Sequence, residues 1–305
     1  MSIFQLPSPT QEIKLPLYQN SGLKVYIKRD DLIHPTVSGN KWRKLKWFIQ
    51  YALDNNYEGV LSFGGAYSNH LHATAYACKH FQLKCKAVLR GELIDETNPT
   101  LKDIIEQGAK LLPVSREVYR MRNDTNYLKQ LSLDHPGFLI LPEGGYSDLG
   151  KKGVSEIWDE LTYDIDHMIV PVGSATTFAG LINSRPKSIN TQLHGILSVK
   201  DKSLKERLGH LNTEEQPVSL YDQYTRGGFA KVDSELILFI NQFKEQTAIQ
   251  LEPIYTAKMF LAFHQMIDTK KFQNGETVLL VHTGGLQGIR GHNLRYADQA
   301  ELLIN

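Results

Sequence analysis

Hydrophobic residues follow two alternating spacings along most of this chain. Short apolar runs, typical of buried strands, alternate with longer stretches in which apolar residues recur every three or four positions, as on one helix face. The short runs predict strands within residues 24–28, 60–63, 87–89, 111–114, 138–141, 168–171, 193–197 and 277–282. The longer stretches predict helices that begin near Lys41 and that cover about 68–80, 98–108, 117–133, 149–161, 176–184, 234–246 and 256–268. Residues 199–224 are polar and lack a clear period, so they receive no assignment.

Strands and helices that alternate in this order form parallel sheets with helices on both faces. The predicted strands are more numerous than one sheet needs. We therefore expect an α/β protein of two open parallel-sheet domains, with a ligand cleft between them.

Composition narrows the class of protein without naming its chemistry. The 305 residues are 41% hydrophobic and 22% charged, which is ordinary for a globular protein. A net charge of +1 gives no electrostatic basis for binding nucleic acid or an acidic membrane, and no apolar run is long enough to span a bilayer. The N-terminus lacks the pattern of a signal peptide, and Cys78 and Cys85 form no disulfide framework. We expect a cytoplasmic protein with neither nucleic-acid nor membrane partners.

The residues Ser38-Gly39-Asn40 lead directly into a helix whose first residue is Lys41. Lys41 lies at the edge of the predicted buried face, on the first helical turn, where backbone N–H groups lack helical partners. An amine there can be desolvated and become nucleophilic. The alternative is a solvated basic helix face, because Arg43, Lys44 and Lys46 follow. Periodicity alone does not distinguish Lys41 from Lys46.

Four segments rich in glycine and hydroxyl side chains follow predicted strands. They are Gly64–His70, Glu143–Ser147, Gly173–Thr177 and Thr283–Gly288. Ligands of open α/β sheets bind at the edge where the strands end. One such turn is weak evidence because helix starts favour these residues anyway, but four of them together with Lys41 favour a ligand site.

Gly173–Thr177 is the best candidate for a phosphate site, since it opens a helix with free N–H groups and two threonine hydroxyls. No Walker loop and no GxGxxG motif is present, which favours a small phosphorylated cofactor over a dinucleotide. Ser68-Asn69-His70 offers a hydroxyl, an amide and an imidazole at a helix start, where an amino-acid carboxylate is well received. In both segments the alternative is simple helix capping.

Two further groups have competing interpretations. His70, His72, Cys78 and His80 lie close in sequence, but they lack the i, i+4 spacing of helical metal ligands, so we expect no metal site. Tyr255 precedes an apolar helix and is either a core aromatic or a hydroxyl that relays a proton.

Gly39-Asn40-Lys41 followed by Arg43-Lys44-Leu45 resembles the cofactor-lysine motif of the 1-aminocyclopropane-1-carboxylate deaminase and D-cysteine desulfhydrase family. These are pyridoxal 5'-phosphate enzymes with the tryptophan synthase β-subunit fold. The resemblance extends over roughly residues 26–290, through segments in the family's order: 68–70, 143–145, 173–177, 253–255 and 283–285. It implies a homodimer, with residues 1–45 and 151–305 as a large cofactor-binding domain and 46–150 as a small domain.

The resemblance also implies residue roles. Lys41 would hold the cofactor covalently and move the substrate's α-proton, Asn69 would bond the cofactor's ring hydroxyl, and Thr283 would approach the pyridine nitrogen. Ser68 and Tyr255 would be catalytic residues beside the substrate, whose binding site would include Asn69 and His70. The phosphate would be held by Gly173, Ser174, Ala175, Thr176 and Thr177.

The same resemblance also indicates which of the family's reactions is favoured in this protein. In the cyclopropane deaminases the residue after the matching tyrosine is a glutamate, which keeps the pyridine nitrogen protonated, whereas here it is Thr256. A neutral threonine at this position favours α,β-elimination from a small amino acid, which gives a 2-oxo acid and ammonia. D-Cysteine is the substrate that we expect first. Phe229 stands where both subgroups usually carry a tyrosine, and Ala175 replaces a usual glycine. The alternatives are a cyclopropane deaminase, a catalytically silent protein that binds the cofactor, and a protein of this fold that binds another phosphorylated ligand.

Overall fold

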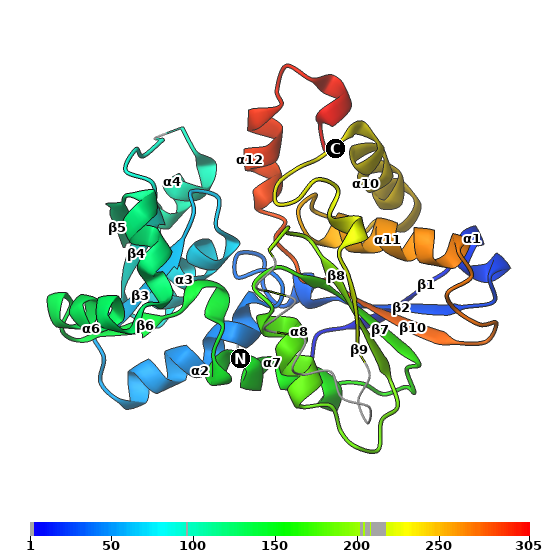
Figure 1. Cartoon of the computed structure of the whole chain (residues 1–305), viewed down its shortest axis with the longest axis horizontal. Coiled ribbons are helices and arrows are strands. Elements are labelled where there is room, and N and C mark those ends of the chain that lie inside the picture. The colour runs from blue at the N-terminus through cyan, green and yellow to red at the C-terminus, as the bar shows by residue number, and fades with distance from the viewer. Residues whose placement is uncertain (1–2, 96, 202–203, 205–207, 209–217) are drawn as a thin grey trace. The chain divides into compact units, whose positions relative to one another are not determined.

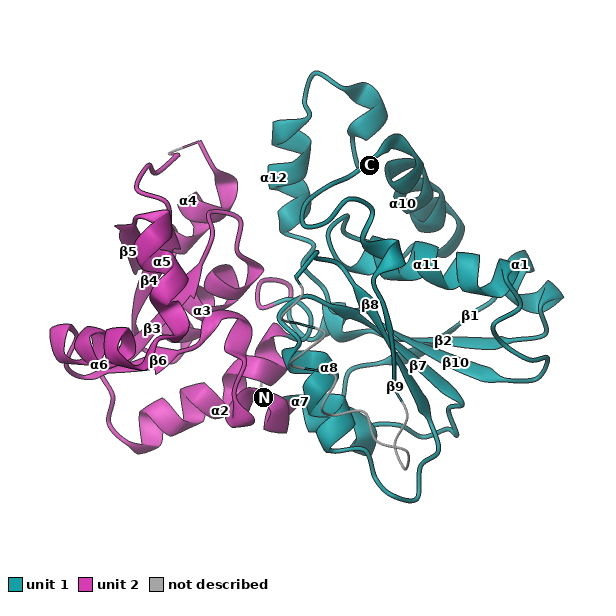
Figure 2. Cartoon of the chain, in the orientation of Figure 1, with its two compact units in different colours: residues 1–34, 38–40, 154–305 teal, residues 35–37, 41–153 magenta. Residues whose placement is uncertain are grey.

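The computed structural model describes residues 3–95, 97–201, 204, 208 and 218–305. The chain forms two compact units (Figure 2). Unit 1 contains residues 1–34, 38–40 and 154–305, and unit 2 contains residues 35–37 and 41–153. Part of the unassigned stretch 199–224 lies outside the described residues. Among the described residues, we find no helix with the length and apolar character that crossing a membrane requires.

Unit 1 is built on a six-stranded sheet in the order β1-β2-β10-β7-β8-β9. Its strands are β1 (Thr10–Ile13), β2 (Lys24–Lys28), β7 (His167–Val172), β8 (Gln192–Leu197), β9 (Val218–Tyr221) and β10 (Thr277–Val281). All neighbouring strands are parallel except β1, which pairs antiparallel with β2. The α-helices whose bounds the described residues give in this unit are α1 (Pro16–Asn20), α8 (Thr176–Asn183), α10 (Ser234–Thr247), α11 (Thr256–Asp268) and α12 (Gly288–Arg295).

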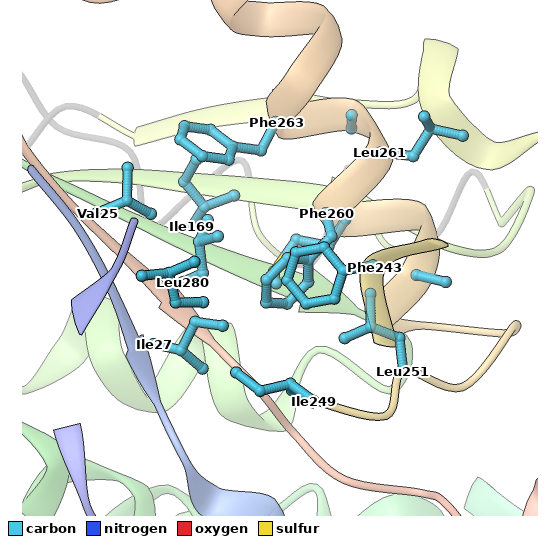
Figure 3. Close-up of a cluster of buried hydrophobic side chains, with 14 of the residues drawn as sticks. Val25, Ile27, Ile169, Phe243, Ile249, Leu251, Phe260, Leu261, Phe263 and Leu280 are labelled. Carbon is cyan, nitrogen blue, oxygen red and sulfur yellow. The ribbon is translucent and has the colours of Figure 1, made fainter. Parts of the chain in front are cut away.

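The core of unit 1 lies between this sheet and α10 and α11. Val25, Ile27, Ile169 and Leu280 point from the strands toward Phe243 and Phe260 on these helices (Figure 3), and all six side chains are buried. On the opposite face α8 packs against the sheet, since a Cβ at Gly195 of β8 would touch the ring of Phe178. Helices on both faces explain why the central strands read as continuous apolar runs.

Unit 2 is built on a four-stranded parallel sheet in the order β5-β4-β3-β6. Its strands are β3 (Gly59–Gly64), β4 (Lys84–Arg90), β5 (Ala109–Val114) and β6 (Phe138–Leu141). Its described α-helices (Figure 1) are α2 (Lys41–Asp54), α3 (Asn69–His80), α4 (Pro99–Glu106), α5 (Arg116–Arg120) and α6 (Thr125–Asp134). Helix α7 (Asp148–Asp159) begins in unit 2 and ends in unit 1. The predicted parallel sheets are therefore confirmed.

All eight predicted strands are present, but one predicted helix is wrong. The stretch 117–133 is not continuous, because α5 ends at Arg120 and α6 begins at Thr125. Asp124 between them has extended backbone (φ −75°, ψ 128°), and its carboxylate accepts hydrogen bonds from the N–H groups of Asn126 and Tyr127. An aspartate that caps a new helix start interrupts the pattern even though the apolar spacing continues. The elements β1, α1, β9 and α12 were not predicted.

A buried histidine pair in unit 1 makes stability depend on pH. His194 Nε2 lies 3.0 Å from His167 Nδ1, and its other nitrogen lies 3.2 Å from the hydroxyl of Tyr221. Burial, and then the charges of His167 and Lys271, lower the pKa of His194 to about 3. Between pH 6.5 and this value the unfolded chain binds a proton at this residue that the folded chain rejects, so stability falls as pH falls.

We expect the free energy of unfolding to fall below pH 6.5 with a slope from His194 that approaches about 1.4 kcal/mol per pH unit. Urea unfolding at pH 7.5, 6.0 and 5.0 measures this slope. His194→Gln should flatten it even though the variant is less stable at pH 7.5, and the exposed His80→Gln should leave it unchanged. Equal slopes in wild type and His194→Gln would contradict this assignment.

Candidate active site

Unit 1 brings together two of the four predicted segments and the residues Ser38–Asn40 at one edge of its sheet. β7 and β10 are neighbours, so the segments that follow them, Gly173–Thr177 and Thr283–Gly288, leave the same edge of the sheet. Ser38–Asn40 reaches this edge through Asn40, whose N–H donates to the carbonyl of Thr283 at 3.3 Å. Asn40 Nδ2 also donates to Thr177 Oγ1 at 2.6 Å. The residue directly before Lys41 is thus bonded to both segments.

The approach of these segments requires glycine at two positions. Gly39 has φ +71°, and a Cβ there would lie 1.8 Å from the carbonyl oxygen of Thr283. Gly284 also has φ +71°, and its Cβ would lie 2.5 Å from the Cα of Gly39. Only residues without a side chain allow two backbones to approach this closely. The motif therefore fixes the position of the chain just before Lys41.

The phosphate-loop candidate has the geometry of an anion site. Ala175 precedes α8 with φ 69°, and Ser174 Oγ lies 3.0 Å from Thr176 Oγ1. Thr177 Oγ1 accepts from Asn40, which leaves its own hydrogen for another acceptor. The α8 N-terminus adds backbone N–H groups and the positive end of the helix dipole.

Two buried hydroxyls at this edge have no hydrogen-bond partner among the described residues: those of Ser38 and Ser198. Ser198 directly follows β8, and its N–H donates to the carbonyl of Val172 at the end of β7. Buried polar atoms are normally paired with a hydrogen-bond partner. A polar group bound next to the anion loop would supply the partner that these two hydroxyls lack. Sequence reasoning missed Ser198, because a single serine after a strand carries no signal of its own.

A buried carboxylate fixes the backbone at Tyr255. Glu252 is 1% exposed, and its Oε1 accepts from the N–H groups of Tyr255 and Thr256, both at 2.7 Å. Its Oε2 accepts from the N–H of Ile254 at 2.8 Å. The hydroxyl of Thr256 in turn accepts from Glu252 N at 2.9 Å and donates to Glu252 O at 3.2 Å. This reciprocal cap holds Tyr255 at the start of α11.

We expect Glu252→Ala to lower the free energy of unfolding by about 3 kcal/mol, because three N–H groups at a buried helix start lose their acceptor. Glu252→Gln is the matched control. It keeps one oxygen for Tyr255 and Thr256, so it should cost roughly half as much. Urea unfolding of both variants gives the two values, and an alanine variant as stable as the glutamine variant would rule out this role of the carboxylate.

Unit 2 places Lys41 next to other basic groups. Lys41 is the first residue of α2, and Lys44, one turn later, is only 5% exposed. Burial, and then the nearby Lys41, lower the pKa of Lys44 well below its usual value. Gly145, in the segment after β6, lies against this turn, since a Cβ there would be 3.2 Å from the Cβ of Lys44. The alternative of a solvated basic helix is wrong for Arg43 and Lys44, which are both buried.

Ser68, Asn69 and His70 all lie at the start of α3. Ser68 caps the helix by accepting from the N–H of Leu71 at 3.2 Å, and Asn69 is its first residue. The capping interpretation of Ser68 is confirmed, and its predicted catalytic role stays a prediction. Both residues are partly exposed, while His70 is 4% exposed.

The tautomer of His70 follows from its partner. Ser62 donates its only hydroxyl hydrogen to the carbonyl of Leu141 at 2.9 Å, so His70 Nε2, at 2.9 Å from the same hydroxyl, is the donor. His70 Nδ1 is then an unprotonated acceptor, and it has no hydrogen-bond partner among the described residues. Burial, and then Lys41 and Lys44, lower the pKa of His70 to about 3, which keeps the ring neutral.

Comparison with known proteins shows to which family the chain belongs. The sequence matches the model of the family described as pyridoxal-phosphate dependent enzyme over residues 3–284. The chain belongs to this family. The predicted cofactor and the prediction of an enzyme are therefore confirmed.

Its relatives include proteins of the subgroup that the motifs predicted. A Pyrococcus abyssi protein described as a candidate 1-aminocyclopropane-1-carboxylate deaminase is 32% identical over 93% of this chain and 90% of its own length. The mitochondrial bifunctional D-cysteine desulfhydrase/1-aminocyclopropane-1-carboxylate deaminase of Arabidopsis thaliana is 29% identical over 94% of this chain and 78% of its own. A crystal structure of an ACC deaminase homologue matches with a TM-score of 0.81 at 27% identity, covering 98% of this chain and 94% of the homologue. The suspected family and fold are confirmed.

The described residues fit pyridoxal phosphate. Unit 1 offers the anion loop and the unpaired hydroxyls of Ser38 and Ser198, which suit a phosphate. Lys41, the residue directly after Asn40, is an amine of the kind that holds this cofactor. When bound, the cofactor supplies an electron sink for a carbanion at the substrate's Cα. The individual roles predicted for Lys41, Ser68, Asn69, His70, Gly173–Thr177, Tyr255 and Thr283 stay predictions.

Proposed function

We propose that the protein is a lyase that eliminates the β-substituent of a small amino acid, with D-cysteine as its best substrate. The reaction breaks the Cα–H and Cβ–S bonds and releases hydrosulfide. Hydrolysis of the remaining unsaturated amine gives pyruvate and ammonia. The name of the Arabidopsis relative includes this activity.

The observation that carries the proposal is the state of Thr256. In the cyclopropane deaminases that this sequence resembles, a glutamate stands here to protonate the pyridine nitrogen. Thr256 is buried, and its hydroxyl is bonded to the backbone N–H and carbonyl of Glu252. The neutral Thr283 hydroxyl then remains for the ring nitrogen. A neutral partner makes a weaker electron sink, which suffices when the leaving group is a thiolate.

We assign the steps as follows. Lys41 holds the cofactor and then moves the α-proton. Ser68 and Asn69 receive the substrate carboxylate and the ring hydroxyl, and Tyr255 lies beside the substrate as a proton donor. His70 Nδ1, as an acceptor, takes a hydrogen bond from the substrate's amino group. The segment Gly173–Thr177 holds the phosphate.

Incubation of the purified protein with D-cysteine, D-serine and 1-aminocyclopropane-1-carboxylate tests the proposal. Pyruvate, 2-oxobutyrate and ammonia are measured for each substrate. We expect kcat/KM to be highest for D-cysteine. Turnover of the cyclopropane substrate alone would reverse the order of the two activities.

A cyclopropane deaminase is the second candidate, because the names of the Pyrococcus and Arabidopsis relatives and of the crystallised homologue all include this activity. A catalytically silent protein is the third, motivated by Phe229 in place of a usual tyrosine. This third hypothesis predicts that the protein shows the visible absorbance of lysine-bound cofactor but forms no product from any amino acid.

We also propose that unit 1 corresponds to the large cofactor-binding domain and unit 2 to the small one. We further propose that the protein acts in the cytoplasm as a homodimer. Cys78 and Cys85 are buried free thiols, which suits a reducing compartment. Light scattering after gel filtration measures the oligomeric state, and a monomer at micromolar concentration would contradict the dimer.

A further inference from the structure

The loop Thr225–Ala230, which we call the Phe229 loop, has an unusual backbone. Positive φ angles occur at Arg226 (48°), Gly227 (87°), Gly228 (111°) and Ala230 (54°). For Arg226 and Ala230, which carry side chains, this left-handed conformation is unfavourable by itself. A loop of this kind keeps its shape only when neighbouring groups hold it.

Lys258 of α11 holds the Phe229 loop from inside. Its Nζ donates to the carbonyl of Thr225 at 3.0 Å and to that of Gly228 at 2.7 Å, and the residue is 1% exposed. Burying an amine is unfavourable unless its donors are paired, and here two carbonyls pair them. From outside, Arg226 binds Asp233 and Glu235 near the start of α10, with the shortest N–O distances at 2.6 Å.

The loop presents one aromatic side chain. Phe229 is 51% exposed, yet its ring centroid lies 6.4 Å from that of Tyr255. Tyr255 also covers the phosphate loop, because a Cβ at Gly173 would lie 2.6 Å from its ring. Phe229, Tyr255 and Gly173 therefore form a continuous row within unit 1. Lys258 follows Tyr255 by one turn of the same helix, so one element fixes both aromatic rings.

We propose that Lys258 is a positioning residue that holds Phe229 against Tyr255, and that Phe229 forms an apolar wall of the substrate site that selects amino acids with an uncharged β-substituent. This inference rests on the proposed function for its substrate. The ring of Phe229 offers no hydrogen bond to a charged group, so a charged substituent placed against it would lose hydration without compensation. An uncharged thiol, hydroxyl or chloride meets no such penalty.

The variants Lys258→Met, Phe229→Ala and the double variant test the proposal. Lys258→Met has the size of lysine without its donors. We expect it to raise KM for D-cysteine about tenfold, equivalent to roughly 1.4 kcal/mol, with kcat changed less than about twofold and the cofactor absorbance unchanged. In the Phe229→Ala background, Lys258→Met should raise KM no further, because the two residues act as one unit. Additive effects on KM would overturn the proposal.

Lys28→Met is the matched control. Lys28 is also fully buried in unit 1, where its Nζ donates to the carbonyl of Ser8 and pairs with Glu160, both at 2.6 Å. Its replacement should lower stability without changing KM. An equal increase of KM in Lys28→Met would show that the effect of Lys258→Met is a general loss of stability, and would overturn the proposal.

Two measurements complete the test. The ratio of kcat/KM for β-chloro-D-alanine over O-phospho-D-serine should fall at least about fivefold in Phe229→Ala, and an unchanged ratio refutes the selective wall. Trypsin cleavage after Arg226 and Lys231 should be at least about tenfold faster in Lys258→Met than in wild type. This readout needs no substrate. Absence of turnover in wild type refutes the proposed function, whereas equal cleavage rates refute the role of Lys258.

Discussion

Replacing Lys41 by alanine is expected to abolish the visible absorbance of lysine-bound cofactor and to lower kcat/KM at least about a thousandfold. Lys41 is the first residue of α2, and the backbone before it is fixed by the bonds of Asn40 to Thr177 and Thr283. We propose that this amine is both the attachment point and the proton carrier, so no side-chain rearrangement should replace it. Absorbance spectra and pyruvate formation measure the two losses.

Lys46→Ala is the matched control for this prediction. Lys46 lies on the same helix, is partly exposed and borders the same apolar face. Its replacement should leave the spectrum and the activity close to wild type. Borohydride reduction of the wild-type protein followed by peptide mapping gives an independent answer, and a cofactor adduct on any other lysine would refute the assignment of Lys41.

Gly39→Ala should lower the free energy of unfolding by more than about 4 kcal/mol and reduce the bound cofactor to a small fraction of the wild-type content. Its Cβ would lie 1.8 Å from the carbonyl oxygen of Thr283 and 2.6 Å from the N atom of Gly284, so the two backbones must separate. Separation would also break the hydrogen bond from Asn40 to Thr283 and move the residue that precedes Lys41.

Gly275→Ala separates this clash from the cost of backbone conformation. Gly275 has φ +92°, and a Cβ there would meet nothing within 4 Å. We therefore expect a loss of only about 1 kcal/mol, with full cofactor content. Urea unfolding and cofactor absorbance compare the two variants. If Gly39→Ala were as mild as Gly275→Ala, the close approach at Thr283 would not be needed for the site.

The sequence predicts strands such as β7 and β10 because their residues are almost all buried and mostly apolar. It predicts α4 almost to the residue, since Asn98 and Pro99 mark its start with local chemistry. β1 was missed because only Ile13 of its four residues is buried, so its side chains lack a clear pattern. Asp124 was missed because the apolar spacing around it continues through the break between α5 and α6.

The candidate site was predictable wherever backbone geometry imposes a residue type. Gly39 and Gly284 are such positions. Both belong to segments that the sequence singled out, and their backbones approach each other closely in the fold. Glu252 and Lys258 were not predicted, because a buried charge carries meaning only through partners that fold against it. Glu252 caps its own turn, and Lys258 reaches carbonyls that lie 30 and 33 residues earlier in the chain. No periodicity connects those positions.

The reciprocal cap between Glu252 and Thr256 has a consequence for engineering a different reaction in this protein. Thr256, which we propose favours elimination over ring opening, is also a structural part of the turn before α11. Exchanging Thr256 for glutamate would bring a second buried carboxylate next to Glu252 and remove the hydroxyl that accepts from Glu252 N. A change of reaction at position 256 therefore requires a compensating change at Glu252. Directed evolution toward ring opening should select the two positions as a pair.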